Sequence, residues 1–234
     1  IAIMFIPTLI YGFLFLGQTF PSTQDDANGS TKANFRAILS SPIYWFMLVC
    51  MALTATTELG TQSWVEKLFA KSGAEPLLAL VLITGLMALG RFYAGPVIKR
   101  LNIPGVLLAS AIITLISLYI LSTATGSMVY VGGVLFAVGV CYFWPNMIGF
   151  VATYLPKTGA LGMSMIGGVG MVGLSIFQPI IGQWMDSETK IAEANGLVGD
   201  AATLAAGQAT LDNIAVLPAI LILAFALLYV YKDK

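Results

Sequence analysis

Residues 128–154 read MVYVGGVLFAVGVCYFWPNMIGFVATY and carry no charged side chain. Because an α-helix rises about 1.5 Å per residue, a run of this length exceeds the roughly 30 Å hydrocarbon core of a bilayer. Surface helices of water-soluble domains keep a polar face, which this run lacks. It therefore predicts a membrane-spanning helix, and the rest of the chain can be tested in the same way.

Six further apolar runs approach or reach spanning length. They cover residues 1–17, 42–65, 77–98, 103–123, 159–184 and 213–231. The sequence thus predicts an all-α, polytopic membrane bundle. In this prediction residues 1–17 are the end of a preceding transmembrane helix, residues 18–41 are a cytoplasmic linker, and residues 42–234 form a six-helix bundle.

The connections between the runs differ in length and composition. Residues 18–41 are polar, which is typical of a flexible linker or a loop with short surface helices. Residues 185–212 are acidic and then alanine-rich, and we expect a loop there with a surface helix at about residues 200–210. The spacing of the runs also indicates two groups of three helices with inverted topology, 42–123 and 128–231.

Composition agrees with a membrane protein and excludes several other classes. Of 234 residues, 58% are apolar and 9% charged, too few charges to cover the surface of a soluble domain. Eleven basic residues balance eleven acidic ones without the basic face that nucleic-acid binding needs. Histidine is absent, and Cys50 and Cys141 both lie in apolar runs. We therefore expect no disulfide, no metal site, no cofactor and no enzymatic nucleophile–base pair.

Charges in the connections predict the orientation. If residues 18–41 are cytoplasmic, eight basic residues fall on the cytoplasmic side and three on the other. Cytoplasmic loops are enriched in Lys and Arg, so we predict a protein of the cytoplasmic (inner) membrane with its C-terminus in the cytoplasm. The eight are Lys32, Arg36, Arg91, Lys99, Arg100, Lys157, Lys232 and Lys234, and the three are Lys67, Lys71 and Lys190.

Glu58 is the one acid deep inside an apolar run. A carboxylate at membrane depth costs at least ~2.5 kcal/mol, so it normally faces a cavity or a partner. Thr54, Glu58, Thr61 and Gln62 have the spacing of one helical stripe. About 24 Å of helix from Pro42 would place Glu58 in the outer part of the bilayer. The stripe indicates solute binding or proton carriage, and a polar helix–helix contact is the alternative.

A second candidate site lies around Pro145, in the middle of its run. Proline releases a backbone carbonyl and kinks the helix, while Tyr142 and Asn146 are one turn apart on a common face. Aromatic rings such as Trp144, beside amide groups, suit a sugar. An aromatic packing cluster is the alternative. Gln178 in the following run is a third candidate.

Glycines are dense between residues 159 and 184. Residues 168–173, GVGMVG, match the dinucleotide-binding fingerprint in letters, but that fingerprint requires a strand and a turn into a helix N-terminus. In a membrane helix, glycines instead permit close approach of a neighbouring backbone. We interpret them as helix-crossing positions.

Two short motifs resemble those of the major facilitator superfamily. Residues 90–100, GRFYAGPVIKR, are similar to the cytoplasmic loop between the second and third helices of a half of that fold, although Lys99 stands where an acid is usual. Residues 179–186, PIIGQWMD, resemble its eleventh helix, and residues 57–64 are loosely similar to the fucose and hexose–proton symporters. The resemblance assigns gating or conformational roles to Gly90, Arg91, Gly95, Arg100, Pro179, Gly182 and Asp186.

This resemblance implies the C-terminal six-helix half of a twelve-helix transporter, preceded by the end of helix six. Such a protein works by alternating access together with an N-terminal six-helix half. The implied partners are the lipid bilayer, a small polar solute such as a sugar or nucleoside, and optionally a proton. The candidate residues for solute binding or coupling are Glu58, Gln62, Thr54, Thr61, Tyr142, Trp144, Asn146 and Gln178.

Two other functions stay open at this point. An organic-anion exchanger of the same superfamily needs an arginine or lysine at mid-membrane depth, and we expect none in this chain. A non-transporting membrane solute sensor would bind its solute without flux.

Overall fold

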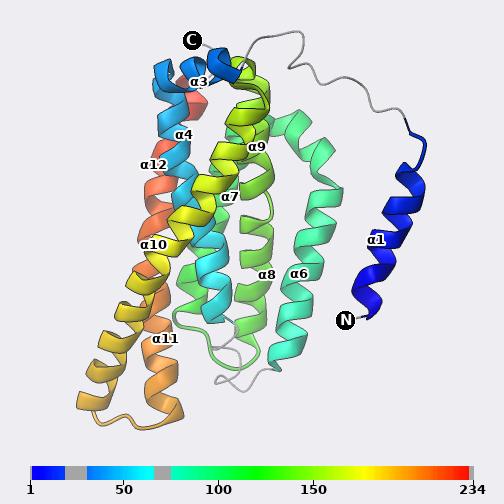
Figure 1. Ribbon diagram of the computed structural model, residues 1–234. Coiled ribbons are helices and arrows are strands. Elements are labelled where there is room, and N and C mark those ends of the chain that lie inside the picture. Colours follow the sequence, from blue (N-terminus) through cyan, green and yellow to red (C-terminus); the bar gives the residue numbers. More distant parts are fainter. Residues whose placement is uncertain (1, 19–30, 66–74, 232–234) are drawn as a thin grey trace.

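The computed structural model describes residues 2–18, 31–65 and 75–231, and every secondary-structure element within them is a helix (Figure 1). Residues 19–30 of the predicted linker and residues 66–74 lie outside this description. Of the described linker residues, Thr31–Ser40 form a helix, α3, which agrees with the second of the two alternatives, a loop with short surface helices.

Five helical segments are long and apolar enough to cross a membrane. They are Pro42–Val65, Ala94–Leu121, Met128–Tyr154, Pro156–Ala194 and Asp200–Tyr231. The predicted all-α fold is thereby confirmed for the described residues, and the five segments agree with the predicted polytopic membrane protein. Two further apolar helices, α1 (Ala2–Phe15) and α6 (Pro76–Phe92), are shorter at 14 and 17 residues. The half-fold, the kind of membrane and the side of the C-terminus stay predictions.

The first long span changes its helical type halfway. Ser41 caps α4 (Pro42–Ala55) by accepting a hydrogen bond from the Tyr44 N–H at 3.3 Å, and Pro42 occupies the first turn, where its missing N–H costs nothing. From Thr56 to Gly60 the chain is a π-helix, η1, before it continues to Val65. A π-helical turn inserts an extra residue, so the predicted stripe of four polar residues is not one continuous helical face.

The predicted run 77–98 ends early. Helix α6 stops at Phe92, Tyr93 forms a turn, and α7 (Ala94–Leu121) begins directly after it. Within α7 the chain leaves helical geometry at Asn102, where φ is +55°. The Asn102 side chain accepts a hydrogen bond from the Gly105 N–H at 3.0 Å and so starts a new helical stretch. That stretch agrees with the predicted start of the next span at residue 103.

The run 128–154 is broken in the middle, as the proline predicts. Helix α8 (Met128–Val140) and helix α9 (Phe143–Tyr154) are separated by a turn at Cys141 and Tyr142. The two halves still form one continuous span in length and hydropathy.

The predicted loop at 185–212 is wrong. Helix α10 (Gly159–Ala194) continues through its first ten residues, because neither proline nor glycine interrupts residues 183–194. The helix ends at Asn195, followed by Gly196 with φ of +86°. Helix α11 (Asp200–Ile214) confirms and extends the helix expected at 200–210, and α12 (Val216–Tyr231) follows it.

Neighbouring helices pack closely where glycines face them. Helix α7 lies along α8 and α12, while α10 packs against α4 and α11 (Figure 1). A Cβ added at Gly173 would lie 2.8 Å from the Cα of Ala52 in α4, and one at Gly139 would lie 2.8 Å from the backbone nitrogen of Thr114 in α7. The interpretation of glycines as crossing positions is therefore confirmed at Gly173, whereas Gly167 and Gly168 face open space.

Candidate functional site

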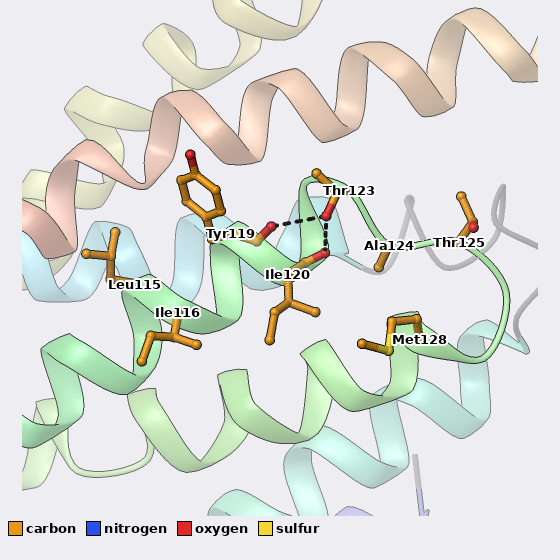
Figure 2. Close-up of a pocket in the computed structure, with 8 residues that line it drawn as sticks. All are labelled: Leu115, Ile116, Tyr119, Ile120, Thr123, Ala124, Thr125 and Met128. Atoms are coloured by element: carbon orange, nitrogen blue, oxygen red, sulfur yellow. Dashed lines mark hydrogen bonds between the residues drawn. The ribbon is translucent and has the colours of Figure 1, made fainter.

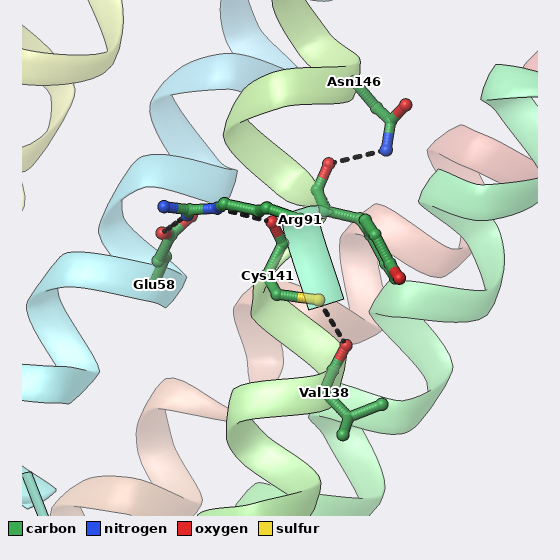
Figure 3. A network of polar contacts seen from close by, with 6 residues as sticks. Glu58, Arg91, Val138, Cys141 and Asn146 are labelled. Carbon is green, nitrogen blue, oxygen red and sulfur yellow. Dashed lines mark hydrogen bonds and ion pairs between the residues drawn. The ribbon is translucent and has the colours of Figure 1, made fainter. Parts of the chain in front are cut away.

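Glu58 lies in the interior of the bundle on the π-helical segment η1, and only 3% of the residue is exposed. Its Oε1 accepts a hydrogen bond from Nη2 of Arg91 at 2.9 Å, which makes an ion pair (Figure 3). The backbone of Trp144 also approaches the carboxylate, but the buried Oε2 has no hydrogen bond of ordinary geometry within the described chain. π-Helical turns are frequent at functional sites, because the extra residue re-aims a side chain.

Arg91 comes from the last turn of α6 and reaches the middle of another span. Its Nε donates to the carbonyl oxygen of Cys141 at 2.9 Å (Figure 3). Cys141 is the central residue of the span Met128–Tyr154. The Arg91 side chain, expected beside a connection, therefore reaches the middle residue of a candidate span, whereas the membrane depths of Arg91 and Glu58 stay predictions. Because Arg91 stands beside a connection in the sequence, its position did not predict how far its long side chain reaches inward.

The carbonyl that Arg91 binds is open because of a proline. In an α-helix the N–H of residue 145 would donate to the carbonyl oxygen of residue 141. Pro145 has no N–H, so the carbonyl of Cys141 is left without its helical partner. The backbone carbonyl that the sequence predicts to be released is thus identified, and the structure shows which side chain takes it.

The break between α8 and α9 separates two partial charges. The end of α8 presents a carbonyl oxygen, which attracts a cation, and the start of α9 presents unpaired N–H groups, which attract an anion. Arg91 occupies the first position, and Glu58 lies near the backbone of Trp144 at the second. The ion pair is therefore aligned with the dipoles of the broken helix.

The other residues near Pro145 are bonded to the protein itself. Tyr142 donates its hydroxyl to the carbonyl oxygen of Gly90 at 2.9 Å, and the Asn146 amide donates to the carbonyl oxygen of Tyr142 at 2.9 Å. Trp144 is half-buried, and its ring packs against Gly170. A Cβ added at Gly170 would lie 3.1 Å from the nearest atom of that ring. In this conformation Tyr142 connects α9 to α6, which fits the packing alternative, whereas Asn146 bonds within the first turn of its own helix.

Gln178, from α10, contacts the end of η1 and the residues that follow it. Its Nε2 donates to the hydroxyl of Ser63 at 3.0 Å, and its Oε1 lies 3.6 Å from where a Cβ on Gly60 would be. This oxygen and the hydroxyl of the buried Thr61 make no hydrogen bond within the described chain. The structure thus brings Gln178 to the same helical segment as Glu58 but not into the ion pair.

The two remaining residues of the predicted stripe, Thr54 and Gln62, differ in burial. Thr54 is buried and donates to the carbonyl oxygen of Met51 at 3.0 Å, a bond within its own helix. Gln62 is half-buried.

The predicted gating residues have different surroundings. Gly90 packs against Cys141, where an added Cβ would lie 3.0 Å from the sulfur, and Arg91 joins Glu58. Gly95 and Gly182 have open space around them. Pro179, Arg100 and Asp186 are exposed, and neither charged residue of these three forms an ion pair with another described residue.

Sequence reasoning missed two residues of this site, Cys141 and Ser63. Cys141 contributes its backbone carbonyl, and the signal for it was present, because it stands four residues before Pro145. Ser63 follows Gln62 in the polar stretch but lies outside the helical stripe, and only its contact with Gln178 distinguishes it.

An apolar pocket of about 640 Å³ lies away from this site, at the end of α7 and the start of α8 (Figure 2). It is lined by Leu115, Ile116, Tyr119, Ile120, Thr123, Ala124, Thr125 and Met128, without a charged residue.

Within the described residues, no group of three or more His, Cys, Asp and Glu side chains is arranged to hold a metal ion. Comparison with known proteins assigns no family to the chain: no protein-family model, curated protein or solved structure matches it.

Proposed function

We propose that this protein carries out secondary transport of a small polar solute across a membrane by alternating access. The observation that carries the proposal is the Glu58–Arg91 ion pair, held inside the bundle at the break between α8 and α9. Discontinuous helices whose ends face charged groups are a recurring feature of transporter binding sites. The resemblance of residues 90–100 and 179–186 to the major facilitator superfamily points to the same class.

A buried carboxylate is a poor choice for packing alone. Glu58 loses solvation on burial that its attraction to the partly exposed Arg91 only partly offsets, and an apolar side chain of the same volume stabilises a fold as well or better. Charged residues inside membrane spans therefore accompany solute and ion pathways. This argument favours a role in transport over a role in holding the helices together.

The polar groups beside the pair indicate the chemistry of the solute. The Arg91 side chain is 41% exposed and donates through Nε and Nη2, so its other N–H groups are open to a ligand. Glu58 keeps Oε2 as a second acceptor, which is buried in this conformation and becomes reachable for a solute only when the surrounding helices move. A hydroxyl group both donates and accepts, so a sugar or nucleoside can bond to both charged partners. The half-buried ring of Trp144 offers a surface for the C–H faces of such a solute.

Proton coupling at Glu58 follows from the same contact. A protonated carboxyl group carries no charge to hold the guanidinium, so proton uptake weakens the link between η1 and α6 and proton release restores it. This makes the arrangement of two helices depend on one proton.

The test is uptake by the purified full-length protein in proteoliposomes. Labelled sugars, nucleosides and organic anions are supplied separately, with and without an imposed pH gradient. We expect a neutral solute to accumulate only with the gradient. Binding of such a solute without any flux would contradict transport and indicate a sensor.

Variants of Glu58 then test the coupling. Glu58→Gln keeps the shape of the side chain and removes its charge, and we expect gradient-driven accumulation to be lost while solute exchange persists. Glu75→Gln makes the same change at an exposed acid just before α6 and should leave both activities intact. Unchanged accumulation in Glu58→Gln removes Glu58 from coupling.

The position of Arg91 favours a second candidate, an organic-anion exchanger. Its guanidinium contacts the buried Glu58 while the side chain is 41% exposed, so an anionic solute could compete with Glu58 for it. Such a protein would show anion flux that ignores the pH gradient and requires an anion on the opposite side.

A further inference from the structure

The contact between Arg91 and Cys141 depends on which backbone groups the α8–α9 break leaves open. A regular helix would bond the Cys141 carbonyl to the N–H of residue 145, and Pro145 supplies none. Arg91 Nε donates to that oxygen at 2.9 Å and therefore replaces the missing helical donor. The next residue keeps its helical bond, because the Asn146 N–H donates to the carbonyl oxygen of Tyr142 at 3.1 Å.

The end of α6 is attached to the break at more than one point. The Tyr142 hydroxyl donates to the Gly90 carbonyl at 2.9 Å, and the absence of a side chain on Gly90 lets the Cys141 sulfur come close. Arg91 is thus anchored by its own side chain and by its neighbour's backbone. Pro145 is the residue that leaves the Cys141 carbonyl free for Arg91, because an N–H at residue 145 would bond to that carbonyl and allow the helix to continue through Cys141.

The anchoring fixes the direction of the guanidinium. One nitrogen, Nε, is held by Cys141, and Nη2 of the same planar group is directed at Glu58. Loss of the Nε bond would leave a long, flexible side chain with one contact and several alternative conformations.

We propose that Pro145 is a positioning residue, which reserves the Cys141 carbonyl for Arg91 and thereby holds the guanidinium against Glu58. The proposal rests on the proposed transport function for its consequence in uptake, but not for its structural consequence. It predicts that restoring the N–H at residue 145 acts through Arg91 and not through helix geometry alone.

The test is a double-mutant cycle that compares Pro145→Ala, Arg91→Gln and the double variant. All are made in full-length protein in which Cys50 is substituted, so that Cys141 is the one remaining cysteine. The first readout is the rate at which a maleimide alkylates the Cys141 thiol, which is buried against α6 in the unmodified protein. The second readout is solute uptake. Pro218→Ala is the matched control, because Pro218, like Pro145, is the third residue of the helix that follows a break, here the α11–α12 break.

We expect Pro145→Ala to raise the alkylation rate on the order of tenfold, and to add little in the Arg91→Gln background, since contacting residues are coupled. Pro218→Ala should leave the rate unchanged. Equal effects of Pro145→Ala in both backgrounds, or no effect in either, would overturn the proposal.

Two further controls keep the outcomes separate. If Pro145→Ala does not fold, Pro145→Gly restores the N–H without a Cβ and is measured in the same cycle. If the unmodified protein transports no solute, the proposed function fails, and the alkylation cycle still decides whether Pro145 acts through Arg91.

Discussion

Nη2 of Arg91 lies 2.9 Å from Oε1 of Glu58, although the two residues are 33 positions apart in the chain and belong to different helices. The two side chains differ sharply in exposure, 41% for Arg91 and 4% for Glu58. This difference means that the two partners are not equivalent: Arg91 without its partner can still be solvated, whereas Glu58 without its partner cannot.

The first prediction follows from that asymmetry. Arg91→Gln should destabilise the protein by about 3 kcal/mol because it leaves a buried carboxylate uncompensated, while Glu58→Gln should cost only about 1 kcal/mol. The double variant should recover part of the loss. Thermal unfolding of the purified protein in detergent measures all three, with Arg36→Gln as a control at an exposed arginine of α3. A larger loss for Glu58→Gln than for Arg91→Gln would contradict this account.

The second prediction concerns the crossing of α10 and α4. A Cβ at Gly173 would lie 2.6 Å from the Ala52 Cβ and 2.8 Å from its Cα, so Gly173→Ala forces the two helices apart. Overpacking of this kind costs about 1–3 kcal/mol. Gly168→Ala in the same helix meets open space and should be neutral or stabilising by up to ~1 kcal/mol. Melting temperatures of the two variants distinguish a crossing position from general flexibility of α10. Equal melting temperatures would exclude a crossing position at Gly173.

The third prediction separates packing from solute binding at Tyr142. Tyr142→Phe removes the hydrogen bond to the Gly90 carbonyl and should lower stability by about 1 kcal/mol. Because that hydroxyl is already bonded to the protein, the KM for solute uptake should not change. Tyr119→Phe, at an exposed tyrosine of α7, is the control and should change neither quantity. An increase in KM with unchanged stability would instead assign the hydroxyl to the solute.

The fourth prediction concerns the start of the spanning part of α7. Asn102 combines a φ of +55° with a side-chain bond to the Gly105 N–H. Asn102→Gly keeps the backbone conformation and loses only the cap, at a cost of a few tenths of a kcal/mol to about 1 kcal/mol. Asn102→Ala loses both and should cost about 2 kcal/mol. Unfolding measurements should therefore find Asn102→Ala less stable than Asn102→Gly, the reverse of the order expected inside a regular helix.

The sequence predicted the features that depend on a residue and its near neighbours in the chain, such as apolar length and the missing N–H of proline. The apolar runs located five helical segments of spanning length, because crossing hydrocarbon requires about 20 apolar residues whatever their neighbours are, although the runs 1–17 and 77–98 form shorter helices. Pro42 at the first turn of α4 and Pro145 at the break of the 128–154 run act through their own missing N–H, and both effects appear in the structure. The isolated carboxylate of Glu58 was also correctly identified as the residue that requires a partner.

Other features depend on what lies across the helix interface. The stripe Thr54–Gln62 assumed a regular helix, but η1 changes the helical pitch at Thr56, and a preference for π-helix has no simple sequence signal. Helix α10 extends past residue 184 because its polar residues pack along α11, where Asn213 donates to Glu188 at 3.2 Å. A window of hydropathy ends where the apolar residues end and does not detect such a partner.

The amino-acid sequence therefore predicted a chain of long apolar helices, as the structure has them, and identified Glu58 as a buried acid that faces a cavity or a partner. The identity of that counter-ion was decided only by the tertiary structure. Arg91 stands next to a connection in the sequence, and its guanidinium reaches Glu58 because α6 packs against the α8–α9 break, where a proline has left a carbonyl open. Spacing along one helix describes contacts within that helix, whereas a long side chain that crosses between helices depends on how those helices pack.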